Sequence, residues 1–69
     1  MSVYRVTDVI GTSPTSWEDA AKEALAATAG SLRDLRVAEV SKLDITLTSD
    51  GKIEAFRVKL AVSFKYEKA

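Results

Sequence analysis

The sequence predicts an α+β fold with the element order β-α-β-β, in which a three-stranded antiparallel sheet wraps on one helix. Residues 53–66 alternate apolar and polar side chains, as in a strand with one buried face. Residues 16–29 place apolar and small side chains at offsets of three and four, as in a helix with one buried side. Because the chain has only 69 residues, we expect residues 1–69 to form one domain around a single core.

The first strand is predicted over residues 3–10, with Tyr4, Val6 and Ile10 on one face and Asp8 interrupting them. We expect Gly11 to end this strand, because the next five residues are of types common in turns and helix caps. Residues 12–16 should therefore connect the strand to the helix.

The helix is predicted over residues 16–29. Ser16 with Asp19, or Thr15 with Glu18, has the spacing of a capping box. The expected buried stripe consists of apolar or small residues: Trp17, Ala20, Ala21, Ala24, Leu25 and Thr28. Gly30 is the expected C-terminal stop, and Leu32 and Leu35 should pack beneath the helix end.

A second strand is predicted over residues 36–48, and its apolar pattern changes phase along the way. Its apolar residues begin at even-numbered positions, Ala38 and Val40, and continue at odd-numbered positions, Leu43, Ile45 and Leu47. Either a bulge re-phases the strand, or its far half faces a different partner. We favour the second interpretation, because a helix of roughly 20 Å cannot cover a strand of roughly 40 Å.

The third strand is expected at the centre of the sheet, antiparallel to both neighbours. Residues 49–52 contain Asp50-Gly51, which predicts a hairpin turn into this strand. Its buried face consists of alternate apolar residues: Phe56, Val58, Leu60, Val62, Phe64 and Tyr66. One helix covers only one side of such a sheet, so the other side and the far end of the hairpin should contact other subunits.

Composition narrows the classes of function. Lys and Arg number 10, as do Asp and Glu, so the chain lacks the positive charge typical of nucleic-acid binding. No apolar run approaches the roughly 20 residues of a membrane span, and no signal peptide precedes the first strand, so we expect a cytoplasmic protein. His and Cys are both absent, which removes the commonest general base and any cysteine nucleophile, so we do not expect this protein to be an enzyme.

Several motifs together resemble the dodecins, a family of small proteins that assemble as hollow homododecamers. They are Val9-Ile10-Gly11-Thr12-Ser13, Leu32-Arg33-x-Leu35, Ala38-Glu39-Val40 and Val58-x-Leu60-x-Val62-x-Phe64. The run from Ser2 to Trp17 is most similar to the mycobacterial branch called calcium dodecin. The resemblance covers almost the whole chain and implies a homododecamer.

The resemblance also implies a flavin site, which this sequence alters. In the family, flavins stack between paired tryptophans, and a glutamine binds the ring edge. Here Val37 stands at the tryptophan position, Arg57 at the glutamine position, and Arg36 replaces the preceding aspartate. With Asp44, these residues form the altered flavin pocket. A valine cannot supply the stacking surface of an indole, and a guanidinium only donates hydrogen bonds. Trp17, at the helix start, should be a core or interface residue.

Metal binding is the alternative that the calcium branch suggests. Calcium takes six to eight oxygen ligands, which symmetry-related carboxylates could provide together. The candidate ligands are the carboxylates Asp8, Glu39, Asp44 and Glu54. Each of them could instead form an ion pair. Arg36 and Arg57 could likewise hold a phosphate or another anion, or form ion pairs with Glu39 or Asp44 of another subunit.

These features favour a dodecin-like homododecamer that binds or stores a small ion or metabolite, with calcium the leading ligand. A flavin-storing dodecin that binds riboflavin or FMN is the first alternative. A structural shell without a dedicated ligand is the second.

Overall fold

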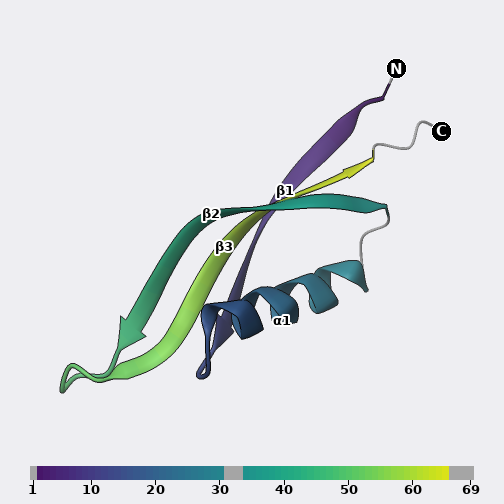
Figure 1. Ribbon diagram of the computed structural model, residues 1–69. Helices are drawn as coiled ribbons and strands as arrows, with labels where there is room; N and C mark the ends of the chain where they lie inside the picture. Colours follow the sequence, from purple (N-terminus) through teal and green to yellow (C-terminus); the bar gives the residue numbers. More distant parts are fainter. Residues whose placement is uncertain (1, 31–33, 66–69) are drawn as a thin grey trace.

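Strand β3 (Ile53–Lys65) lies at the centre of a three-stranded antiparallel sheet, between β1 (Tyr4–Ser13) and β2 (Leu35–Leu47). Helix α1 (Trp17–Ala29) lies across one face of this sheet, as Figure 1 shows. The computed structural model describes residues 2–30 and 34–65. The β-α-β-β order and the central place of β3 confirm the predicted fold class. Leu32 and Tyr66, both expected in the core, lie outside the described residues.

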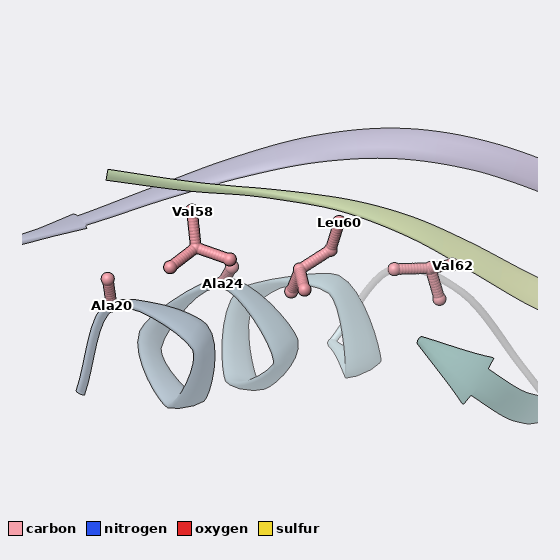
Figure 2. Close-up of a cluster of buried hydrophobic side chains, with 5 residues drawn as sticks. All are labelled: Ala20, Ala24, Val58, Leu60 and Val62. Carbon is pink, nitrogen blue, oxygen red and sulfur yellow. The ribbon is translucent and has the colours of Figure 1, made fainter. Parts of the chain in front are cut away.

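The core forms where β3 faces the helix. Val58, Leu60 and Val62 are each only 1% exposed and point from β3 toward α1, where they meet Ala20 and Ala24 (Figure 2). Their period of two confirms the predicted buried face of this strand. Burying each of these large side chains stabilises the fold by about 1.5–3 kcal/mol relative to leaving it in water.

The helix begins as the capping pattern predicts. The Ser16 hydroxyl accepts a hydrogen bond from the Asp19 backbone N–H at 3.0 Å. The Asp19 carboxylate does not complete a capping box; it accepts a hydrogen bond from Ser13 at 2.7 Å and so ties the helix start to the end of β1. The predicted stripe is confirmed, since Ala20, Ala24 and Thr28 are buried.

The prediction that Gly11 ends the first strand is wrong. Strand β1 continues through Gly11 to Ser13, pairing with Val58 and Phe56 of β3. Gly11 is buried because α1 lies directly against it. A Cβ atom placed there would stand 2.1 Å from the carbonyl oxygen of Ala20 and 2.8 Å from the Cβ of Ala24. The glycine therefore serves the close approach of helix to strand.

The favoured explanation for the phase change in β2 is also wrong. The register of β2 against β3 shifts between Val40 and Lys42, so Ser41 is an extra residue of the bulge type. The bulge brings Leu43 and Ile45 opposite Val58 and Phe56, onto the same side of the sheet as the helix. A single inserted residue thus restores one continuous apolar face.

The β2–β3 hairpin nevertheless extends beyond the helix (Figure 1). Residues 45–55, called the arm below, contain Leu47 and Ile53, which are 59% and 56% exposed. Gly51 has a φ of +84° in the turn, as the Asp-Gly pair predicts. In the described part of the chain, no helix has the length and apolar character that crossing a membrane requires.

Candidate functional site

The sheet face opposite the helix, called the outer face below, carries most of the predicted site residues. Side chains directly opposite each other on paired strands share a face. The outer face therefore includes Asp8 and Ile10 of β1, Val37, Glu39, Lys42 and Asp44 of β2, and Arg57, Lys59 and Ala61 of β3. Arg36 and Glu54 fall at two of the register shifts between β2 and β3, where neither has a directly opposite partner.

Asp44 and Arg57 form the best-defined polar contact on the outer face. The Arg57 guanidinium donates from Nε to one carboxylate oxygen at 2.8 Å and from Nη2 to the other at 3.1 Å. The two side chains are 35% and 40% exposed. The hydrogen bond from Arg57 lowers the pKa of Asp44, with further help from the positive charges of Arg57 and Lys42, although desolvation acts the other way. The sequence predicted that Arg57 pairs with Glu39 or Asp44 of another subunit, whereas here Arg57 pairs with Asp44 of its own chain.

Asp44 also binds the start of the helix through its backbone. Its carbonyl oxygen accepts a hydrogen bond from the Trp17 indole N–H at 3.1 Å. The Trp17 ring packs edge-on against Phe56, with ring centroids 5.1 Å apart and an interplanar angle of 74°. Trp17 is thus held in the packing between helix and hairpin, as predicted.

Within one chain, the altered flavin positions form two separate groups. Val37 is 64% exposed on the outer face. It stands seven positions before Asp44 along an extended strand, a distance of roughly 20 Å. Arg36 lies 3.9 Å from the Asp34 carboxylate. Its pairing with Glu39 or Asp44 of another subunit stays a prediction. Only contact between copies of the chain could bring these two groups together.

The four candidate calcium ligands do not converge within one chain. Asp8 and Glu39 both lie opposite Ala61, one on each side of β3, which places them about 10 Å apart. Asp8 is 4.0 Å from the Lys59 ammonium, and Asp44 is engaged by Arg57. Among residues 2–30 and 34–65, no three carboxylates are close enough together to hold a metal ion. A site of full coordination would need carboxylates from several copies.

A shallow pocket of about 160 Å³ opens on the outer face, lined by Ile10, Lys42, Asp44, Arg57 and Lys59. Lys42 and Lys59 lie directly opposite each other there. Neither lysine was among the predicted site residues. Only the bulge at Ser41 brings Lys42 into register with Lys59, and an uninterrupted register would have placed it on the other face.

Comparisons with known proteins agree with the fold and with the motifs. The family model described as Dodecin matches residues 3–67. The chain is 55% identical to calcium dodecin of Mycobacterium tuberculosis over 69 residues, covering 100% of this chain and 96% of the relative.

Solved structures give the same result. A crystal structure of the M. tuberculosis calcium dodecin, described as calcium chelating and as having a novel calcium-binding site, matches with a TM-score of 0.84 and 53% identity over 99% of this chain and 96% of its own. Dodecin from Streptomyces coelicolor matches with a TM-score of 0.91 and 32% identity over 99% of this chain and 96% of its own. The motifs, the strand order with its single helix and these matches together lead to one conclusion: the chain belongs to the dodecin family.

Proposed function

We propose that this protein is a homododecameric binding and storage protein for a small ion, with calcium the leading ligand, and that it does not bind flavin in the stacked manner. The observation that carries this proposal is the ion pair between Asp44 and Arg57. Arg57 stands where the family resemblance places the glutamine that binds the flavin edge, and two of its donors are already used by Asp44. Val37, at the tryptophan position, offers no ring for stacking.

The similarity to calcium dodecin supports calcium as the ion. Asp8 and Glu39 are the first ligands to test, because both lie on the face that the helix leaves uncovered. Glu39 forms no ion pair with another residue of the described part of the chain, so its carboxylate is free to take a cation. Copies related by symmetry would each add the same two carboxylates and reach the oxygen number that calcium prefers.

The test is the melting temperature of the metal-free protein with and without calcium. Calcium that binds only the folded state stabilises it, by about 2.7 kcal/mol per site at 100 times the Kd. We expect this rise in melting temperature to shrink in Asp8→Asn and Glu39→Gln but not in Glu23→Gln, a matched change on the exposed side of α1. No rise in the parent protein would contradict the calcium proposal.

Riboflavin binding by the same preparation decides the first alternative. Strong quenching of riboflavin fluorescence by the parent protein would show that the altered pocket still holds flavin. If calcium does not raise the melting temperature and riboflavin fluorescence is not quenched, the structural shell without a dedicated ligand is the better description.

A further inference from the structure

We propose that the outer-face pocket is a binding site for a small tetrahedral oxoanion, taken as inorganic phosphate or as the phosphate group of a small metabolite. The site consists of Lys42, Lys59 and Arg57, with Asp44 holding the guanidinium in place. It goes beyond the calcium proposal and does not depend on it, because no candidate calcium ligand except Asp44 lines the pocket.

The strand register gathers three cationic side chains in this pocket. Lys42 of β2 lies directly opposite Lys59 of β3. Arg57 precedes Lys59 by two residues on β3 and so lies on the same face of the sheet. Ile10 of β1 lies opposite Lys59 on its other side and closes the pocket with an apolar wall. The three cations therefore line one pocket from two neighbouring strands, and Ile10 of the third strand closes it.

The charge of the pocket is not balanced by its own residues. Its lining contains three cations and a single carboxylate, Asp44, which Arg57 engages. Lys59 has Asp8 at 4.0 Å, outside the lining, at the limit of an ion pair. Lys42 has no carboxylate within 4.0 Å among the described residues and acts on Asp44 only at longer range. Like charges directly opposite each other destabilise a sheet, and an anion between them would reverse this effect.

The donors and the volume suit an oxoanion. A guanidinium has five N–H hydrogens, and the two bonds to Asp44 leave three for a ligand. Each lysine adds three more donors. The pocket volume of about 160 Å³ falls below the roughly 300–1,000 Å³ of sites that enclose drug-sized molecules. A phosphate group fits this description, whereas a flavin ring does not.

The site is tested by isothermal titration of the intact assembly with phosphate in metal-free buffer, at an ionic strength held constant with sodium chloride. We expect saturable binding by the parent protein. Lys42→Gln should weaken it about tenfold, as expected for the loss of one hydrogen bond to a charged group. The matched control is Lys52→Gln, which removes the same charge from an 81% exposed side chain at the hairpin turn. This control should bind phosphate as the parent does.

A second readout separates a damaged fold from a lost ligand. Without phosphate, Lys42→Gln should melt at or above the temperature of the parent protein, because it removes a repulsion. Phosphate should then raise the melting temperature of the parent and of Lys52→Gln by the same amount and that of Lys42→Gln by clearly less.

Two outcomes would overturn the proposal: no saturable phosphate binding by the parent protein, or equal weakening by Lys42→Gln and Lys52→Gln. Equal weakening would mean diffuse attraction by the whole surface. Parallel titrations with glycerol phosphate identify the source of the oxoanion. Tighter binding of inorganic phosphate supports a site for the free ion, and tighter binding of glycerol phosphate supports a site for a phosphorylated metabolite.

Discussion

Asp44 contacts both layers of the molecule through different atoms. Its carboxylate holds Arg57 on the outer face, while its carbonyl oxygen accepts the indole N–H of Trp17 at the start of α1. Trp17 is the only tryptophan in the chain, so the tryptophan fluorescence comes from a residue that is hydrogen-bonded to Asp44 of the candidate site. A ligand that disturbs the Asp44–Arg57 pair can thus be followed without a label.

The lowered pKa of Asp44 makes stability depend on pH in a defined direction. The folded-state pKa lies below its ordinary value of 3.8, because Arg57 favours the ionised form. The pair therefore contributes its full stabilisation above about pH 4, and this is lost as the pH falls through the lowered folded pKa. We expect Asp44→Asn to lose less stability than the parent between pH 5 and pH 2 in urea unfolding. Identical pH profiles for the two proteins would contradict this role of Asp44. The effect should be modest and reduced by salt, since both side chains are partly exposed.

Restoring two side chains tests the assignment of the altered flavin positions. Val37→Trp combined with Arg57→Gln should introduce riboflavin binding, because the change supplies a stacking ring and an amide that both donates and accepts hydrogen bonds. The measurement is quenching of riboflavin fluorescence, and Val37→Phe with Arg57 retained is the control. A double variant that stays assembled and does not quench would show that position 37 or 57 has been assigned wrongly.

Single-residue chemistry was partly predictable from the sequence. An ion pair of Arg57 with Asp44 was predicted between subunits, because residue types and rough strand positions allowed it, whereas the structure forms this pair within one chain. Lys42 was missed because its face depends on one inserted residue, Ser41, and an alternating pattern alone does not show whether a phase change marks a bulge or a change of partner.

The contact between α1 and β1 depends on small side chains. Gly11 lies against the backbone of Ala20, so Gly11→Ala would force the helix away from the strand. We expect it to lower the free energy of unfolding by about 1–3 kcal/mol, as for other overpacked cores. Gly30→Ala is the matched control, because its φ of −71° suits alanine and its nearest neighbour would be 3.4 Å away. Urea unfolding of both variants at one protein concentration is the measurement. Equal effects of the two changes would contradict the close-approach explanation.

The elements themselves were predictable to within a few residues, since periodicity, the Ser16 cap and the Asp-Gly turn act locally. The end of β1 was not. Glycine commonly ends a strand, but Gly11 instead allows the close approach of the helix, whose nearest carbonyl belongs to a residue nine positions further along the chain. Such a tertiary contact leaves no mark in a local pattern.

Apolar side chains remain exposed on both sides of the isolated chain. Val6 and Ile10 of β1 and Val40 and Leu43 of β2 are all more than half exposed. A single chain of this size buries a modest fraction of its surface, so subunit contacts should supply the missing burial.

Native mass spectrometry of the purified protein is the corresponding measurement, before and after chelation. We expect a mass of twelve chains, with removable metal and no flavin. The reference is the spectrum of the purified protein before chelation and without added riboflavin. A monomer or dimer under all conditions would contradict the assembly on which the storage proposal depends.

The arm formed by residues 45–55 has a consequence for local stability. It is a two-stranded ribbon that extends beyond the helix, and such ribbons are only marginally stable in water. In a separated chain, its amide hydrogens would exchange with solvent through frequent local opening, long before the core around Leu60 unfolds. In the proposed homododecamer, their protection would therefore arise from neighbouring subunits, and the exchange rate of the arm would be a local measure of how firmly that assembly is closed.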